Sequence, residues 1–142
     1  MGLKNPRGIL ISIESSDPCK ALRLVNGIYH RLLNQHIKVH KQIFPARDTP
    51  IGIIIDQYLM SQNVLDDRCL SLLISANHYE FLHEFKYRML YGETVITSRY
   101  IASQRGFIKP DVILSGDRKD IKCVMGRVLR CLKTHSREIN YI

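Results

Sequence analysis

The chain contains no long apolar run, and this absence removes several classes of protein at once. The apolar run at residues 7–14 is far below the roughly 20 residues that a membrane-spanning helix needs. Glu14 ends this run before any small-residue cleavage site, which argues against a secretory signal peptide. We therefore expect a cytoplasmic or nuclear protein that has no membrane partner.

Paired cysteines are also absent. Cys19, Cys69, Cys123 and Cys131 occur singly and form no CxxC motif. A zinc site would need closer spacing and a histidine partner at ligand distance. We expect the cysteines to be small buried residues in a reducing compartment, and we expect no protein metal site.

Internal repeats, low-complexity stretches and linkers are missing as well, so residues 1–142 are expected to form a single domain. The chain does have an excess of positive charge, with 21 Lys and Arg against 13 Asp and Glu and a formal net charge of +8. Basic charge attracts polyanions such as nucleotides, nucleic acid or an acidic membrane surface. Charge alone does not choose among them.

Strand and helix patterns alternate along the chain. Compact or β-branched segments predict strands at residues 7–14, 37–44, 93–98, 111–115 and 139–142. Helical spacing of apolar residues predicts helices at 20–34, 50–60, 66–90 and 119–134. This alternation favours a three-layer α/β fold with a five-stranded parallel sheet flanked by helices. In such folds ligands bind at the carboxyl ends of the strands.

The loop after the first expected strand, "ESSDPCKAL", lacks glycine. A phosphate-binding loop reads GxxxxGK followed by Ser or Thr. Its backbone N–H groups cradle the phosphates, and its hydroxyl holds magnesium. With Lys20 as the anchor, the glycine and hydroxyl positions hold Glu14, Cys19 and Ala21. Pro18 removes a further N–H donor. These residues predict weak phosphate binding by the loop.

Further blocks follow in a fixed order: "FPARDTPIG" (44–52), "LLISANHYEF" (72–81), "VITSRY" (95–100), "KPDVIL" (109–114) and "RVLRCLK" (127–133). Together they resemble the thymidylate kinase family, closest to its eukaryotic and poxviral type. The resemblance extends over essentially the whole chain. It implies a P-loop nucleoside-monophosphate-kinase-like fold and transfer of phosphate from ATP, with Mg²⁺, to dTMP to give dTDP.

The resemblance also implies roles for individual residues. dTMP would be held by Phe44, Pro45, Arg47, Leu59, Asn77, Arg99 and Tyr100. Lys20, Asp17 and Arg99 would be catalytic, and Lys20 and Arg118 would bind ATP. His78 stands where the family has an arginine that helps to hold the base, and we expect this histidine on the face of its helix rather than as a base reader.

The chain departs from the family pattern at several of these positions. Ser98 replaces the aspartate that lies near magnesium. The family's arginine-rich lid and C-terminal helix are expected to be missing from this shortened domain. Phosphoryl transfer depends on positioning and charge neutralisation, so these losses predict weak or lost activity.

Two hypotheses remain. One is a minimal thymidylate kinase, with dTMP held by Phe44, Arg47 and Arg99 and ATP approached by Lys20. The other is a catalytically inactive relic that binds nucleotide, RNA, a ribonucleoprotein or a protein partner, through either the nucleotide pocket or the basic side of the helix at residues 119–133. The family also implies a homodimer, and the apolar stripe of residues 66–90 offers an interface.

Overall fold

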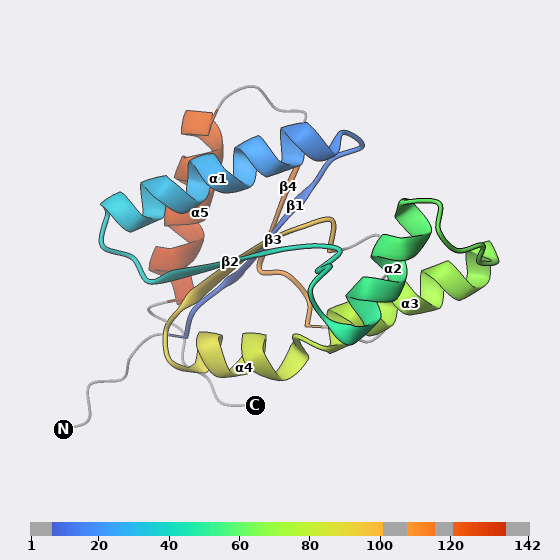
Figure 1. Cartoon of the computed structure of the whole chain (residues 1–142). Helices are drawn as coiled ribbons and strands as arrows, with labels where there is room; N and C mark the ends of the chain where they lie inside the picture. The colour runs from blue at the N-terminus through green and yellow to red at the C-terminus, as the bar shows by residue number, and fades with distance from the viewer. Residues whose placement is uncertain (1–6, 101–107, 116–120, 136–142) are drawn as a thin grey trace.

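The computed structural model describes residues 7–100, 108–115 and 121–135, and it contains a parallel sheet between two layers of helices (Figure 1). The described strands are β1 (Leu10–Glu14), β2 (Val39–Ile43), β3 (Thr94–Ser98) and β4 (Val112–Ser115). All pair in parallel, in the order β2-β3-β1-β4. The expected α/β fold is confirmed, with four strands described. The fifth expected strand, at residues 139–142, lies outside the described residues.

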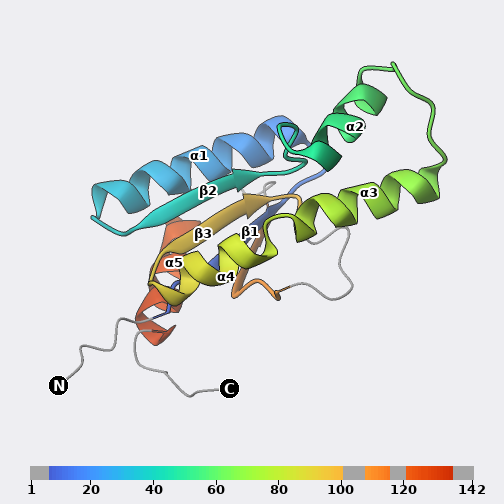
Figure 2. The same cartoon turned by 60° about the horizontal axis from the view of Figure 1, so that its bottom comes forward.

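The described helices are α1 (Pro18–Asn34), α2 (Pro50–Leu59), α3 (Asp67–Tyr79), α4 (Leu82–Leu90) and α5 (Ile121–His135). Two views show α1 and α5 on one face of the sheet and α4 on the other, while α2 and α3 extend beyond the carboxyl ends of the strands (Figures 1 and 2). Among the described residues, no helix is long and apolar enough to cross a bilayer.

The strand β1 is buried on both faces, as its isoleucine-rich run predicts. Ile11 and Ile13 pack with α1 and α5 in one core cluster. Leu10, the residue before Ile11, is in register with Val95 of β3 and belongs to a second cluster with Phe85 and other residues of the opposite layer. A buried central strand therefore holds the two cores together.

The prediction of a single helix at residues 66–90 is wrong, because one helix ends at Tyr79 and a second begins at Leu82. The two helices pack against different partners: α3 packs against α2, whereas α4 packs against β3. Phe81 precedes α4 as its N-cap without a side-chain capping bond. The apolar spacing continues across the break, which is why periodicity alone does not reveal it.

The expected burial of the cysteines is also wrong at two positions. Cys19 and Cys69 are exposed, and Cys131 is partly buried. Cys19 lies in the first turn of α1 and Cys69 in the first turn of α3, where side chains face solvent beyond the core.

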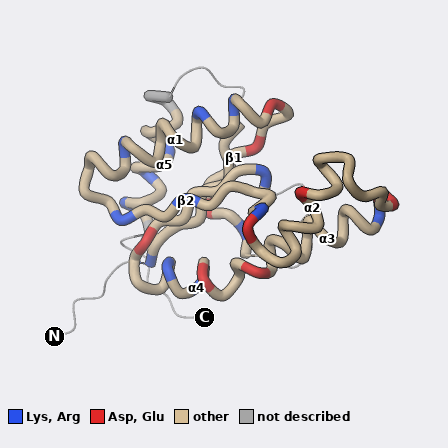
Figure 3. The backbone as a smooth tube through the Cα atoms, in the orientation of Figure 1, with Lys and Arg blue, Asp and Glu red and all other residues tan. Residues whose placement is uncertain are grey.

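Charge is distributed unevenly over the helices. Neither α1 nor α5 contains Asp or Glu, and Lys and Arg are distributed along both of these neighbouring helices (Figure 3). Among the described residues, the exposed Lys and Arg of these two helices are Lys20, Arg23, Arg31, Arg127, Arg130 and Lys133. We call these six residues the basic face. The acidic residues near the sheet lie mostly on the side of α2, α3 and α4.

Candidate functional site

The candidate site lies where the carboxyl ends of three neighbouring strands meet. Ser98, the last residue of β3, is in register with Ile13 of β1 and with Ile43 of β2. The loops that follow these strands therefore start side by side, as a parallel sheet requires. They contain most of the residues for which the sequence predicts a nucleotide role.

The loop after β2 is held by the start of α2 and by α3. Thr49 caps α2, with its hydroxyl accepting a hydrogen bond from the Gly52 N–H at 3.0 Å. A Cβ on Gly52 would lie 1.7 Å from the Ala46 carbonyl oxygen, so only glycine allows this approach. Pro50 directly after the cap gives the helix its start, as the Thr-Pro pair predicts.

Asn77 binds this loop through both ends of its side-chain amide. Its Oδ1 accepts from the Ala46 N–H at 2.8 Å, and its Nδ2 donates to the Ala46 carbonyl at 3.0 Å. The same Nδ2 lies 2.9 Å from Thr49 Oγ1 and 2.8 Å from Glu80 Oε2. Asn77 is 1% exposed, so these contacts are made in a buried environment.

Arg47 follows Ala46 and reaches solvent. Its guanidinium donates to Asp56 of α2 at 2.9 Å, and both side chains are well exposed. No role was predicted for Asp56, Thr49 or Glu80, although Thr before Pro is a recognisable helix start. Pro45 is partly buried beside Phe44, which is 3% exposed.

The end of β3 brings Arg99 and Tyr100 to the same edge. Arg99 adopts a φ of 55°, its N–H donates to Ile13 of β1 at 3.0 Å, and its side chain is exposed. The Tyr100 N–H donates to the Glu14 carboxylate at 2.9 Å. Glu14 therefore fixes the turn after β3 from the end of β1. The only sequence signal for this role is an acidic residue that ends a buried strand.

Aromatic rings fill the space beneath these loops. Phe44 contacts His78, Phe81, Phe85 and Tyr100, with centroid distances of 4.2, 5.5, 6.2 and 6.1 Å. Burial lowers the pKa of His78 to about 4 and is the main cause that raises the pKa of Tyr100 to about 12. His78 was expected on the face of its helix rather than as a base reader; it lies on α3, is 2% exposed and packs into this aromatic cluster.

The loop before α1 is occupied by its own hydrogen bonds. Asp17 is the N-cap of α1, and its Oδ1 accepts from the N–H groups of Cys19 at 2.8 Å and Lys20 at 3.4 Å. The Asp17 N–H donates to Ser15 Oγ at 3.1 Å, and the Ala21 N–H donates to the Asp17 carbonyl at 3.1 Å. Pro18 has no N–H. Every backbone donor from residue 17 to residue 21 thus already has an acceptor within the chain.

The remaining predicted site residues are spread more widely. Lys20 is exposed in the first turn of α1. Leu59 is 48% exposed at the last turn of α2, about 14 Å along the helix from its start. Arg118 lies outside the described residues. Among those residues, no group of three or more His, Cys, Asp or Glu is placed to hold a metal ion.

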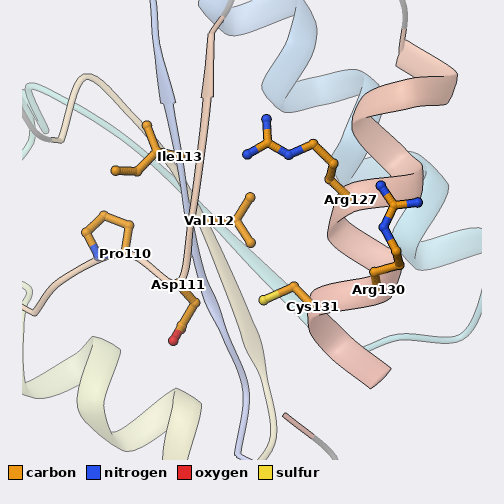
Figure 4. A pocket seen from close by; sticks show the side chains of 7 residues that line it. All are labelled: Pro110, Asp111, Val112, Ile113, Arg127, Arg130 and Cys131. Carbon is orange, nitrogen blue, oxygen red and sulfur yellow. The ribbon is translucent and has the colours of Figure 1, made fainter. Parts of the chain in front are cut away.

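A groove of about 510 Å³ lies away from this edge, beside the first residues of β4. Its lining comes from two elements, with Arg127, Arg130 and Cys131 on α5 across from residues 110–113 (Figure 4). Both arginines belong to the basic face. Asp111, at the end of the groove, is engaged by Arg7 at 2.7 Å and by the Leu10 N–H at 2.8 Å.

The family model and the similar proteins of known sequence all indicate one family. The thymidylate kinase family model matches residues 23–109. The chain is 31% identical over 139 residues to the putative thymidylate kinase 251L of invertebrate iridescent virus 6, covering 84% of this chain and 65% of that protein. It is 36% identical over 104 residues to the thymidylate kinase of Schizosaccharomyces pombe, covering 73% and 50%. The chain spans about half to two thirds of the length of these relatives.

Solved structures show the same likeness in three dimensions. The thymidylate kinase of Candida albicans superposes with a TM-score of 0.61 at 24% identity, covering 95% of this chain and 79% of that chain. The thymidylate kinase of Ehrlichia chaffeensis gives a TM-score of 0.66 at 17% identity, covering 93% and 84%. At these identities the likeness establishes the fold.

Proposed function

Because the chain belongs to the thymidylate kinase family, we propose that it binds dTMP at the carboxyl edge of its sheet and transfers phosphate from ATP weakly or not at all. The monophosphate half of the site has residues that suit this ligand. The phosphate-donor half does not. The observation that carries this division is the hydrogen bonding of the loop at residues 17–21.

Two arginine side chains, each next to a hydrogen-bonded stretch of backbone, support binding of dTMP. Arg47 and Arg99 are both exposed, and each follows directly on a backbone segment that hydrogen bonds hold in place. Guanidinium groups match the geometry of a phosphate and bind it with two N–H donors. The buried rings of Phe44 and Tyr100 form an apolar layer beneath the two arginines.

The ATP half lacks the donors that a phosphate needs. Cradling a phosphate takes several free backbone N–H groups at the start of a helix. Here the Asp17 carboxylate accepts from two of these groups, and its negative charge lies where a phosphate would approach. The residues also fit magnesium poorly, because Ala21 has no hydroxyl and Ser98 is buried in place of a carboxylate.

Ligand-dependent melting tests the proposal directly. Binding raises stability by RT ln(1 + [L]/Kd), about 2.7 kcal/mol at a ligand concentration of 100 Kd. We expect dTMP to raise the melting temperature and Mg-ATP to leave it unchanged. The variant Arg47→Ala/Arg99→Ala should lose the response to dTMP while remaining folded. Micromolar affinity for Mg-ATP at physiological salt would contradict the proposal and support an active kinase.

A second candidate function, binding of RNA, is favoured by the basic face. The helices α1 and α5 lie side by side without an acidic residue on either, and Arg127 and Arg130 line an open groove. Such a surface attracts a phosphate backbone and releases counterions when it binds. If this second candidate is right, RNA binding does not require the carboxyl edge of the sheet, where dTMP is proposed to bind.

The salt dependence of RNA binding distinguishes this candidate. Affinity for a single strand should fall with rising salt by roughly 0.7 log units per phosphate contact. Arg127→Ala/Arg130→Ala should reduce the slope by about one to two units. Arg68→Ala, on α3 and 94% exposed in its side chain, is the matched control and should leave the slope unchanged. Equal slopes for all three proteins would remove the support for RNA binding by this face.

We also propose a homodimer formed through α2 and α3. These helices and the connection between them expose several large apolar side chains, including Ile53, Leu59, Val64 and Leu72. Apolar surface of this kind on one side of a small domain commonly marks a protein interface. Its partner in this proposal is the same surface of a second copy.

A further inference from the structure

The strongest unexplained feature of the site is the number of contacts that Asn77 makes with the chain itself. Its Oδ1 accepts from one backbone N–H, and the two hydrogens of its Nδ2 have three acceptors within 3.0 Å. An amide has only two N–H donors to give. Asn77 therefore has no donor left for a nucleotide.

The orientation of this amide follows from its partners. The Ala46 N–H needs an acceptor and the Ala46 carbonyl needs a donor, and a side-chain amide supplies both at the spacing of a peptide group. With Asn77 and Ala46 both nearly fully buried, water cannot replace either bond. Removal of the amide would leave the buried Ala46 N–H without its acceptor and the Ala46 carbonyl with only the Thr49 hydroxyl, at 3.3 Å.

The peptide that Asn77 binds directly precedes Arg47. The side chain of Arg47 is held separately by Asp56 of α2, at 2.9 Å. Because that ion pair is exposed, it fixes the guanidinium only weakly. The buried contact to Ala46 is the firmer of the two restraints on the arginine.

We propose that Asn77 positions Arg47 by binding the Ala46 peptide, and that it does not touch the nucleotide. This inference rests on the proposed function, since it assigns how the arginine of the dTMP site is held. Glu80 supports the same arrangement, because its Oε2 accepts from both Thr49 Oγ1 at 2.6 Å and Asn77 Nδ2.

A double-mutant cycle on dTMP affinity separates positioning from direct contact. Calorimetry on the folded proteins should find Asn77→Ala on the order of tenfold weaker than the parent. Asn77→Asp would place a second carboxylate beside Glu80 Oε2 and the Ala46 carbonyl in a buried position, so its affinity should fall at least as far as that of Asn77→Ala. In an Arg47→Ala background, Asn77→Ala should cause little further loss, because the residue it positions is gone. A loss as large as in the parent background would overturn the proposal.

A stability-matched control excludes a general effect of destabilisation. Val25→Ala removes buried methyl groups from the core cluster on the opposite face of the sheet. It should lower the melting temperature and leave dTMP affinity unchanged. If Val25→Ala weakens dTMP binding as much as Asn77→Ala does, the positioning role is refuted. Asn77→Ser, which is neutral and too short to reach both Ala46 groups, takes the place of Asn77→Ala in this comparison if the latter does not fold.

A measurement without ligand keeps the inference separate from the proposed function. The backbone amide of Ala46 should exchange its hydrogen slowly in the parent and in Val25→Ala, and much faster in Asn77→Ala. A parent that binds no dTMP would overturn the proposed function and the nucleotide part of this inference. The Ala46 exchange rates then decide whether Asn77 binds the loop, and equal rates in all proteins would refute that as well.

Discussion

The imidazole of His78 lies edge-on against the phenyl ring of Phe44, with 4.2 Å between the ring centroids and 77° between their planes. The contact joins α3 to the loop that follows β2. It also places a titratable group in an apolar environment, where burial lowers the pKa of His78 to about 4. At neutral pH the histidine therefore acts as an uncharged aromatic side chain of the core.

This burial predicts a loss of stability in mild acid. Between about pH 6.5 and pH 4, the unfolded chain protonates His78 and the folded chain does not, so unfolding becomes easier as the pH falls. The loss reaches about 3 kcal/mol at the low end of this window. More than about one unit above pH 6.5, His78 is neutral in both states and contributes no pH dependence.

The substitution His78→Phe isolates this effect. It keeps an aromatic ring against Phe44 and removes the titration, so its stability should fall less steeply from pH 6.5 to pH 4. Urea unfolding at several pH values gives the comparison. His40, whose pKa is also lowered, chiefly by burial, is present in both proteins and cancels. Parallel pH profiles for the two proteins would mean that His78 takes up its proton as readily in the folded state as in the unfolded state.

Asp17 should contribute to stability as a helix cap. Asp17→Ala removes the acceptor for the Cys19 and Lys20 N–H groups and should lower the free energy of unfolding by about 1 kcal/mol. Asp17→Ser keeps a capping oxygen without the charge and should restore most of this loss. Thermal or urea unfolding measures both variants. If the serine variant is as unstable as the alanine variant, the contribution of Asp17 is not that of a cap.

Two glycines provide a matched pair. Gly52→Ala would place a Cβ 1.7 Å from the Ala46 carbonyl oxygen, and the required shift of the loop should cost about 3 kcal/mol or more. Gly126 lies in α5, where the nearest atom to a new Cβ is the tip of Arg130 at 3.7 Å. Gly126→Ala should therefore stabilise the protein by about 0.5–1 kcal/mol through helix propensity. An unfolding curve that shows Gly52→Ala to be as stable as the parent would refute the close approach at Gly52, and a destabilised Gly126→Ala would refute the open space at Gly126.

The proposed homodimer predicts a sensitive position on α3. Leu72 is 72% exposed, so Leu72→Glu should leave the fold intact but disrupt association through this surface. Leu33→Glu, at a 42% exposed position on α1, is the control and should leave association unchanged. Sedimentation equilibrium should find a dimer for the parent and the control and a monomer for Leu72→Glu. A monomeric parent would refute the dimer.

Much of the fold could be predicted because its signals are local. The isoleucine-rich run that forms β1, the helical spacing from Ala21 to Leu32 in α1, and the Thr49-Pro50 start of α2 all lie within short stretches of chain. The order of the five sequence blocks between residues 44 and 133 indicated the family, because several blocks in sequence are more specific than any one of them. The missing glycines of the loop at residues 14–20 could likewise be read directly.

What the sequence by itself determined was the alternation of strands and helices, the family and the residue types at the carboxyl edge. Only the tertiary structure decided what those residues contact. In the folded protein His78 is buried in the core, and the helix α3 ends at Tyr79. Both ends of the Asn77 amide form hydrogen bonds with Ala46, which is 31 residues away in the chain. The tertiary structure also joined Glu14 to the Tyr100 N–H across 86 residues. Local pattern reports which way a side chain can point within its own helix or strand, whereas hydrogen-bond partners and burial depend on which elements the sheet brings together.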